Sequence, residues 1–248
     1  MLKIDSVVKF YKKGGLFSKE RQQVLKNVSF ECKNGECLGI IGESGSGKST
    51  LGRLIVGIEK PDHGTVLFEG KNVRDNRVRL GAISAVFQDY KSSINPFFTI
   101  EEAIMEPLNG QKKSQKEKQN KVDTLLHQVG LDPTYKKKYP HELSGGEVQR
   151  VCIARAISTE PKCILLDEAI SSLDISVQIQ VLNLLKELKK VYNISYIFIT
   201  HDIQAAAFIC DRVIIFRNGQ IEENVYIEQL KDVQSEYAKK LLEMLITF

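Results

Sequence analysis

A glycine-rich loop, GESGSGKST from Gly42 to Thr50, follows a short apolar run and precedes a segment with helical spacing. The loop fits the phosphate-binding pattern G-x-x-x-x-G-K-[ST], which requires a strand before it and a helix after it. Glycines let backbone N–H groups converge on phosphate oxygens, and the helix N-terminus adds partial positive charge. Lys48 is expected to bridge the β- and γ-phosphates, and the Ser49 hydroxyl to bind Mg²⁺. The sequence therefore predicts a nucleoside triphosphate site formed by Gly42, Ser44, Gly45, Ser46, Gly47, Lys48, Ser49 and Thr50.

Two adjacent carboxylates end an apolar run further along the chain. The residues from Cys163 to Leu166 form a run of strand type, and Asp167 and Glu168 follow it directly. In open α/β sheets ligands bind beyond the carboxyl ends of the strands, which is where these acids would lie. Asp167 is predicted to hold Mg²⁺, directly or through water, and Glu168 to orient and polarise the attacking water. Such a strand end also fits a solvated turn, and the phosphate loop in the same chain favours the functional interpretation.

Two further polar side chains follow apolar strands in the same manner. His201 comes after the run from Tyr196 to Thr200, and Gln88 ends the run from Ile83 to Phe87. His201 is predicted to reach the γ-phosphate from the same edge of the sheet. Gln88 carries a neutral amide that could touch Mg²⁺ or the attacking water, although taken alone it fits a structural role better.

Apolar periodicity divides the chain into alternating strands and helices. Strands are predicted over 24–33, 36–41, 65–68, 83–87, 163–167, 195–200 and 212–216, and helices over 48–58, about 175–191 and the last part of the chain. The dipeptide Asn34-Gly35 predicts a tight hairpin between the first two strands. Between residues 100 and 158 helical patterns dominate, and a Gly130 cap follows an apolar face of Val122, Leu125, Leu126 and Val129. The alternation in the second half of the chain is typical of a parallel α/β sheet.

The composition excludes several classes of protein. The 248 residues are 42% hydrophobic and 27% charged, which is ordinary for a globular protein and argues against a disordered or fibrous chain. A net charge of +4 is too small to indicate a nucleic-acid surface, and the basic runs at 112–121 and 136–138 are predicted to be a solvated helix face and a loop. No apolar stretch approaches the ~18 residues of a membrane span, and the N-terminus lacks a signal peptide. The five cysteines are predicted to be buried thiols in a cytosolic chain.

A second helix start has the character of an anion site. The residues Ser144, Gly145, Gly146 and Glu147 precede a segment with helical apolar spacing. Two glycines and a hydroxyl at a helix N-terminus can bind phosphate, although one triphosphate needs only one phosphate loop. Taken alone, the same residues also fit a simple helix cap.

The full set of motifs resembles that of the ATP-binding cassette (ABC) ATPases. In that family GESGSGKST corresponds to Walker A, CILLDE to Walker B, LSGGE to the signature and SSLD, which ends at Asp174, to the D-loop. Gln88 and His201 resemble the Q-loop and H-loop residues, and Tyr11 resembles the aromatic residue that stacks on adenine. The resemblance implies an α/β fold, a P-loop NTPase core with a mostly parallel sheet, an N-terminal antiparallel β part and an inserted α-helical subdomain.

The resemblance also implies how the chain is organised and how it works. One ABC ATPase domain would span residues 1–248, with its nucleotide-binding core at 1–88 and 160–225, its helical subdomain at 89–159 and a C-terminal helix at 226–248. In this family the signature of one cassette closes on the Walker A of another, so Ser144, Gly145, Gly146 and Glu147 would act on the ATP of a second cassette, identical or related. ATP and Mg²⁺ are the implied cofactors, with Ser49, Gln88 and Asp167 as metal ligands.

A closer resemblance points to the peptide and nickel importers. The stretch from Gln88 to Thr99, QDYKSSINPFFT, and the later Glu106-Pro107-Leu108 are similar to Q-D-P-x-S-S-L-N-P and E-P-L in that branch. The chain departs from the family at Glu147, where Gln is commoner, and at Ala169-Ile170, where Pro-Thr is usual. It ends at Phe248 without the long cysteine-bearing extension of many peptide importers, which favours nickel or a metal chelate over peptides as cargo. The branch implies two membrane permease subunits, an extracytoplasmic solute-binding protein and a peripheral position on the cytoplasmic face of the membrane.

Other functions and one local alternative remain open at this point. A non-transport ABC ATPase that acts on nucleic acid or ribosomes is the second class, although such proteins often carry two cassettes or a long coiled coil in one chain. An ordinary P-loop kinase or GTPase gives no reason for LSGGE. The segment with Ile94, Pro96, Phe97 and Phe98 could contact the membrane subunits, or could be buried inside the helical insert.

Overall fold

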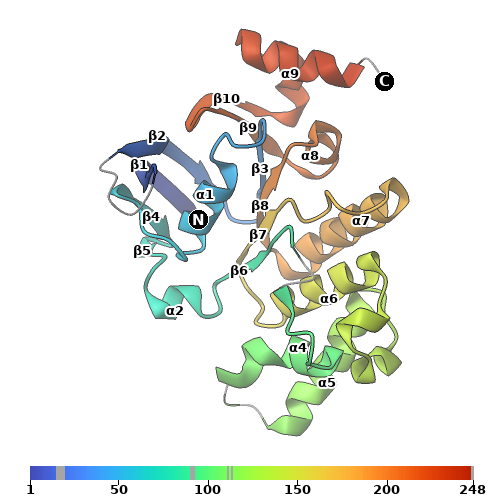
Figure 1. Cartoon of the computed structure of the whole chain (residues 1–248). Coiled ribbons are helices and arrows are strands. Elements are labelled where there is room, and N and C mark those ends of the chain that lie inside the picture. The colour runs from blue at the N-terminus through green and yellow to red at the C-terminus, as the bar shows by residue number, and fades with distance from the viewer. Residues whose placement is uncertain (15–19, 90–92, 111, 113, 247–248) are drawn as a thin grey trace. The chain divides into compact units, whose positions relative to one another are not determined.

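The computed structural model describes residues 1–14, 20–89, 93–110, 112 and 114–246 (Figure 1). The chain divides into two compact units. Unit 1 contains Met1–Leu80 and Ser195–Phe248, and unit 2 contains Gly81–Ile194. Each unit has its own strands and helices, and each is described by itself.

An antiparallel sheet opens unit 1. Its strand order is β2-β1-β4-β5, formed by β2 (Arg21–Cys32), β1 (Leu2–Lys12), β4 (His63–Phe68) and β5 (Lys71–Asn72). Leu2 of β1 lies opposite Cys32 on one side and Phe68 on the other. Leu2 and Ile4 are buried and alternate with exposed residues, as in a sheet with one covered face. The short helix α2 (Asn76–Arg79) follows this sheet, and Asp75 caps its N-terminus.

The second set of strands in unit 1 is mostly parallel. The strand β3 (Cys37–Ile41) pairs in parallel with β8 (Ser195–Thr200) and β9 (Arg212–Arg217), and β10 (Gln220–Tyr226) pairs antiparallel with β9. Every residue of β3 and β8 is buried, which explains their continuous apolar sequences. The helices of this part are α1 (Lys48–Ile55), α8 (Ile203–Ile209), the 3₁₀ helix η4 (Ile227–Asp232) and α9 (Glu236–Ile246).

The hairpin predicted across Asn34-Gly35 is wrong. The chain does turn there, with Gly35 at a φ of 72°, and the Gly35 N–H donates to Ser195 Oγ at 2.8 Å. However, β2 pairs with β1, whereas β3 is hydrogen-bonded to β8 on one side and β9 on the other. Because both edges of β3 are occupied, no edge is left for β2, and the turn carries the chain from one sheet to the next.

Unit 2 combines a pair of strands with a group of helices. The strands β6 (Ile83–Val86) and β7 (Cys163–Asp167) pair in parallel, with Ile83 opposite Cys163. The α-helices are α4 (Ile100–Met105), α5 (Gln115–Gln128), α6 (Gly145–Ile157) and α7 (Ile175–Tyr192). The 3₁₀ helices are η1 (Glu106–Gly110), η2 (Pro133–Lys137) and η3 (Pro140–Glu142). The apolar face predicted around Leu125 is buried, and Gly130 follows α5 with a φ of 72°, so the predicted glycine cap is confirmed.

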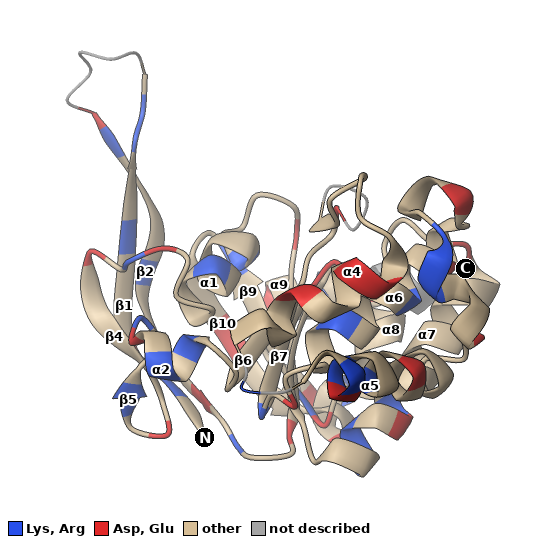
Figure 2. Ribbon diagram, turned by 90° about the horizontal axis from the view of Figure 1, so that it is seen from below, with Lys and Arg blue, Asp and Glu red and all other residues tan. Residues whose placement is uncertain are grey.

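The basic run on α5 is mixed with acidic groups. Figure 2 shows basic and acidic residues side by side on this helix. Lys121 pairs with Glu160 at 2.6 Å, and Lys136 of η2 pairs with Asp123 of α5 at 2.6 Å. The helix α5 therefore carries both signs of charge, as expected for a solvated helix face.

The cysteines are buried, as predicted. All five lie in the described ranges, and no disulfide joins any two of them. Cys37 Sγ and Cys210 Sγ are 3.6 Å apart in the core of unit 1. Burial raises the pKa of the Cys163 thiol to about 12. Within the described ranges, we find no helix with the length and apolar character required to cross a membrane.

Candidate functional site

The phosphate loop begins where β3 ends. Gly42 follows Ile41 with a φ of 156°, and a Cβ built on it would lie 2.0 Å from the Phe216 carbonyl oxygen on β9. Gly47 ends the loop at the N-cap position of α1 with a φ of 107°. A side chain would clash at the first position and strain the backbone at the second. Both glycines are therefore required by the path of the loop between β3 and α1.

Lys48 turns its ammonium group onto the beginning of the loop. Its side chain is only 6% exposed, and Nζ donates hydrogen bonds to the carbonyl oxygens of Gly42 at 2.7 Å and Glu43 at 2.8 Å. A buried ammonium group is strongly stabilised by any anion that comes within reach, because little solvent screens it. Lys48 thus places one positive charge inside the curve of the loop.

The start of α1 fits an anionic ligand. In the described part of the chain, no side chain caps this helix and no acidic residue lies in its first turn. Helix N–H groups without a cap, together with the helix dipole, favour negative charge at this end. Ser46 as a residue is 7% exposed, and its buried hydroxyl finds no hydrogen-bond partner among the described residues. A buried polar atom left without a partner is costly, and a phosphate oxygen or an ordered water would satisfy it.

A cavity of about 190 Å³ lies beside the loop in unit 1. Gly45 and Ser46 line it from the loop, and the turn at Asn218 and Gly219, between β9 and β10, lines it from another side. The Gly219 N–H donates to the Ser46 carbonyl oxygen at 2.9 Å, so this turn holds the loop directly. The sequence analysis missed this contact, since its two halves lie far apart in the chain. The remaining lining residues come from β2 and are Gln22, Gln23, Val24 and Lys26.

Tyr11 lies near the end of β1, and its hydroxyl is bound to a charged pair. The hydroxyl donates to Glu59 Oε2 at 2.5 Å, and Arg53 Nε donates to Glu59 Oε1 at 2.6 Å. Arg53 Nη2 also donates to Thr50 Oγ1 at 3.2 Å. The aromatic residue and the last residue of the phosphate loop are thus linked through Arg53 and Glu59, two residues that the sequence analysis did not single out.

His201 lies directly after β8 and is exposed. The next residue, Asp202, caps α8 by accepting the Ala205 N–H at 3.0 Å, and its own N–H donates to Thr200 Oγ1 at 3.0 Å. In the parallel pair of β3 and β8, Ile41 lies opposite Thr200. Gly42 and His201 are therefore each one residue beyond the paired residues, and this register brings them to the same edge of the sheet.

In unit 2, the acid pair Asp167 and Glu168 lies at the carboxyl end of β7. Asp167 is the last residue of β7 and is 7% exposed, whereas Glu168 is half-buried. Glu168 has a φ of 50°, a left-handed conformation that is uncommon for a residue other than glycine. Its carbonyl oxygen accepts the Ser171 N–H at 3.2 Å and the Ser171 hydroxyl at 3.0 Å. The turn that follows therefore holds the Glu168 backbone in this conformation, at a cost that is typical of functional sites.

Gln88 reaches the same edge of the strand pair as Glu168. Val86 lies opposite Leu166, so Gln88 and Glu168 are each two residues beyond paired residues. Gln88 is exposed. The sequence similarity to the importer branch continues into Tyr90, Lys91 and Ser92, which lie outside the described residues.

The signature residues form a complete helix cap. Ser144 is the N-cap of α6, and its hydroxyl accepts the Glu147 N–H at 3.4 Å. Glu147 Oε2 in turn accepts the Ser144 N–H and the Ser144 hydroxyl, both at 2.7 Å. A Cβ built on Gly146 would lie 2.6 Å from Val177 Cγ1 on α7. The glycine therefore permits close packing of the start of α6 against the first turn of α7, where Asp174 is exposed at the N-cap position.

Glu147 is anchored on both carboxylate oxygens. The Tyr135 hydroxyl donates to Oε1, and this bond, with those from Ser144, lowers the pKa of Glu147 to about 2. Lys138 Nζ lies 3.8 Å from the centre of the Tyr135 ring. The carboxylate is ionised at neutral pH and is already engaged within its own unit, which identifies Glu147 as a residue that holds the cap.

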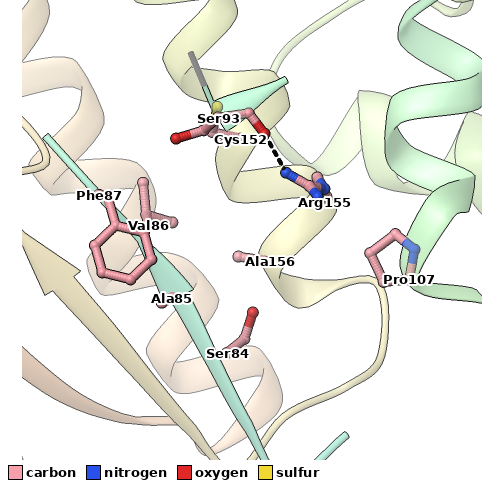
Figure 3. Close-up of a pocket in the computed structure, with 9 residues that line it drawn as sticks. All are labelled: Ser84, Ala85, Val86, Phe87, Ser93, Pro107, Cys152, Arg155 and Ala156. Atoms are coloured by element: carbon pink, nitrogen blue, oxygen red, sulfur yellow. Dashed lines mark hydrogen bonds between the residues drawn. The ribbon is translucent and has the colours of Figure 1, made fainter. Parts of the chain in front are cut away.

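A cavity of about 320 Å³ lies in unit 2 next to β6 and α6 (Figure 3). Arg155 of α6 projects along it, donating to the Ser93 carbonyl oxygen at 2.6 Å and to Glu106 Oε2 at 2.5 Å. Of the residues predicted either to contact the membrane subunits or to be buried in the helical insert, Ile94 is buried, whereas Phe97 is 85% exposed. The other residues that line the cavity are Ser84, Ala85, Val86, Phe87, Pro107, Cys152 and Ala156.

The family model and similar known proteins point to the same kind of protein. Residues 25–171 match the family described as ABC transporter. The chain is 51% identical to the metal-staphylopine import system ATP-binding protein CntF of Staphylococcus aureus (strain NCTC 8325 / PS 47), with all of both chains covered. It is 41% identical to the nickel import ATP-binding protein NikE of Escherichia coli O157:H7, with 90% of this chain and 86% of that protein covered.

Solved structures agree with this assignment. A dimeric structure of the ATP-binding cassette MJ0796 in a post-hydrolysis state, bound to ADP and Pi, matches with a TM-score of 0.82 and 32% identity, covering 92% of this chain and 99% of that one. The structure of cbiO1 from Clostridium perfringens, part of the ABC transporter complex cbiONQ, matches with a TM-score of 0.81 and 27% identity, covering 98% of both. With matches across its whole length and more than half of its residues inside the family region, the chain belongs to the ABC transporter family as an ATP-binding subunit that hydrolyses ATP.

Proposed function

We propose that this chain powers an importer for a metal chelate, as one of two ATP-binding cassettes attached to permease subunits. The observation that carries the proposal is a pair of separate helix starts in one chain. One has no cap and has a buried lysine beside it; the other is fully capped by a Ser-Gly-Gly-Glu sequence. A single nucleotide needs only the first. The second is therefore available to the nucleotide of another cassette.

The phosphate loop would hold the triphosphate. Lys48 would exchange its two backbone carbonyl partners for β- and γ-phosphate oxygens, and the N–H groups at the start of α1 would bind the same oxygens. Tyr11 would stack on the adenine ring.

The donor set fits Mg²⁺. A serine hydroxyl at Ser49, a carboxylate at Asp167 and an amide oxygen at Gln88 are the oxygen ligands that this ion prefers. When bound, the ion neutralises charge on the β- and γ-phosphates.

Hydrolysis would depend on Glu168 and His201. Glu168 would accept a hydrogen bond from the attacking water and orient it, and His201 would donate to a γ-phosphate oxygen. The positive φ of Glu168 supports this role, because a strained backbone is retained where it fixes a side chain in a required direction.

The capped helix would act on the second cassette, identical or related. The N–H groups of Gly145 and Gly146 would bind its γ-phosphate, and the Ser144 hydroxyl would join them by giving up its bond to Glu147 Oε2, with Asp174 of the D-loop at the same surface. Glu147 would contribute by holding the cap rather than by touching nucleotide, because both of its oxygens are engaged within the unit.

The cavity beside Arg155 and the exposed Phe97 would receive a permease subunit at the cytoplasmic face of the membrane. Phe97 is 85% exposed, and an exposed phenylalanine is the kind of apolar group that marks a protein–protein contact. An extracytoplasmic solute-binding protein would deliver the cargo to the permeases.

The names of the relatives support the cargo class. Metal-staphylopine and nickel import subunits match over most or all of their length, and the oligopeptide transport protein AppF of Bacillus subtilis is 40% identical over 74% of its length. A metal chelate is favoured over a peptide because the match to the metal-staphylopine subunit is more similar and covers both chains completely.

The experiment is to isolate a tagged chain from native membranes with its partners, reconstitute the complex in vesicles and measure ATP hydrolysis and uptake. We expect uptake of a metal chelate, with free Ni²⁺ and short peptides as comparison cargoes. Uptake of peptide alone would reject the cargo, and co-purification with nucleic acid or ribosomes instead of permeases would reject transport.

A further inference from the structure

The hydroxyl of Tyr11 is held by a cluster that reaches the phosphate loop. We define the Tyr11 cluster as Tyr11, Glu59, Arg53, Thr50 and Lys9. Every member belongs to unit 1. An aromatic ring needs only its face for stacking, so a hydroxyl with a charged partner is an additional feature that calls for a cause.

Glu59 is the centre of this cluster. Its Oε2 accepts the Tyr11 hydroxyl at 2.5 Å, and its Oε1 accepts Arg53 Nε at 2.6 Å. The Glu59 N–H also donates to the Arg53 carbonyl oxygen at 3.2 Å, so the side chain and the backbone of Glu59 are both tied to the end of α1. Burial raises the pKa of Glu59, but hydrogen bonds from Tyr11 and Arg53 outweigh burial and lower the pKa below its ordinary value. Glu59 therefore stays charged and keeps accepting both bonds at neutral pH.

Arg53 connects the carboxylate to the phosphate loop. Its Nη2 donates to Thr50 Oγ1 at 3.2 Å and to the Tyr11 hydroxyl at 3.5 Å. Thr50 is buried. The three-residue spacing of Thr50 and Arg53 puts both on one face of α1, so the helix that binds phosphate at its start also supports the ring near its end.

Lys9 holds the ring from another side. Its Nζ lies 5.4 Å from the centre of the Tyr11 ring, within range of a cation–π interaction. The same Nζ donates to the Lys60 carbonyl oxygen at 2.7 Å and lies 3.8 Å from Glu59 Oε2. The ring is thus restrained at its hydroxyl and beside its π system.

We infer that Glu59 is a positioning residue that fixes the Tyr11 ring at a set place relative to the phosphate loop, so that a bound nucleotide meets a ring already in position for the base. The inference rests on the proposed function of Tyr11 as the adenine platform. Without Glu59, the nucleotide itself would have to order the ring. Immobilising one side chain costs about 0.5–1.5 kcal/mol. This corresponds to a loss of about 2- to 12-fold in ATP affinity.

The test measures dissociation constants for ATP and for inorganic tripolyphosphate, which carries the phosphates without the base. The full chain is compared with Glu59→Ala, Tyr11→Phe and the double variant. We expect Glu59→Ala and Tyr11→Phe each to weaken ATP about 2- to 12-fold and to leave tripolyphosphate unchanged. The double variant should be no weaker than the single ones, because both remove the same restraint. Glu59→Gln keeps one acceptor for the Tyr11 hydroxyl but turns its amide NH2 toward Arg53 Nε, so it should weaken ATP less than Glu59→Ala does.

Several results would overturn the inference. These are an unchanged ATP affinity in Glu59→Ala, an equal loss for ATP and tripolyphosphate, or effects of the two single changes that multiply in the double variant. If tripolyphosphate binds too weakly to measure, the comparison of single and double variants with ATP decides alone. If Glu59→Ala does not fold, Tyr11→Phe and Glu59→Gln carry the comparison, since an unaltered ATP affinity in Tyr11→Phe contradicts a role for the hydroxyl. A wild-type chain that binds no ATP refutes the proposed function itself, and is thereby distinguished from failure of the inference.

Discussion

Gly146 gives the sharpest test of the packing at the signature. Replacement by alanine adds one Cβ, which would lie 2.6 Å from Val177 Cγ1, whereas ordinary contacts of this kind begin at 3.4 Å. To remove this overlap, either the Val177 side chain or the start of α6 must move. Overpacking of this kind costs about 1–3 kcal/mol, and the helix preference of alanine over glycine returns up to about 1 kcal/mol. We expect Gly146→Ala to destabilise the chain by about 1 kcal/mol and to lower its Tm by about 2–4 °C.

A second substitution reverses the sign of this effect. Val177→Ala removes the methyl group that the new Cβ would meet, so Gly146→Ala in that background should stabilise the chain rather than destabilise it. Thermal unfolding of the wild type, both single variants and the double variant gives the interaction free energy directly. Gly110→Ala is the matched control, because a Cβ at Gly110 meets no described atom within 4 Å, and its Tm should change little. Equal effects of Gly146→Ala with and without Val177 would show that the close approach of α6 to α7 does not exist.

Three further predictions use standard assays. Glu168→Gln should retain ATP binding while lowering the turnover number about 10²- to 10⁴-fold, and near-normal turnover would remove Glu168 from its role. The folded-state pKa of Glu147 is about 2, below its ordinary 4.5, so the stability it contributes is complete above about pH 5 and is lost as the pH falls toward 2. Urea unfolding should show this loss in the wild type and a smaller pH dependence in Glu147→Gln, while equal slopes would contradict it. Phe97→Ser should reduce transport by the reconstituted complex without changing basal ATPase activity or Tm, because Phe97 is exposed; a lower Tm would make it a core residue.

Local sequence signals predicted the elements that depend on neighbouring residues. The caps of α4, α5 and α6 share one local pattern, a Ser or Thr followed three residues later by Glu, and all three form complete capping boxes. Of these, only the cap at Ser144 was considered from the sequence. The strand before the phosphate loop and the helix after it are also present, although α1 ends at Ile55 rather than at residue 58. In each case the determining contacts lie within about one helical turn, which is why a single sequence is sufficient.

Local sequence signals do not show which strands or side chains meet when they lie far apart in the sequence. The hairpin prediction failed because β3 pairs with β8 and β9, about 160 to 175 residues away, and nothing in the turn sequence states which edge a strand will meet. The strand β1 went unpredicted since register shifts interrupt its pairing with β2 at several points and disturb the alternation of buried residues. The bond between Tyr11 and Glu59 spans 48 positions in the sequence, so motif spacing gives no hint of it.

Strand register determines where the candidate residues lie, because it brings residues that are far apart in the chain to one edge of paired strands. In unit 1, residues 42 and 201 each lie one step past the pair Ile41 and Thr200, and in unit 2, residues 88 and 168 each lie two steps past the pair Val86 and Leu166. A one-residue slip of a strand that is buried on both faces would exchange the side chains packed on those faces and mismatch the core, so the core fixes these positions. The chemistry beyond the strand ends is therefore positioned by apolar residues that never touch nucleotide. Substitutions that keep these strands apolar should preserve the alignment, whereas an insertion of one residue within β3 or β7 should displace the functional residue that follows it.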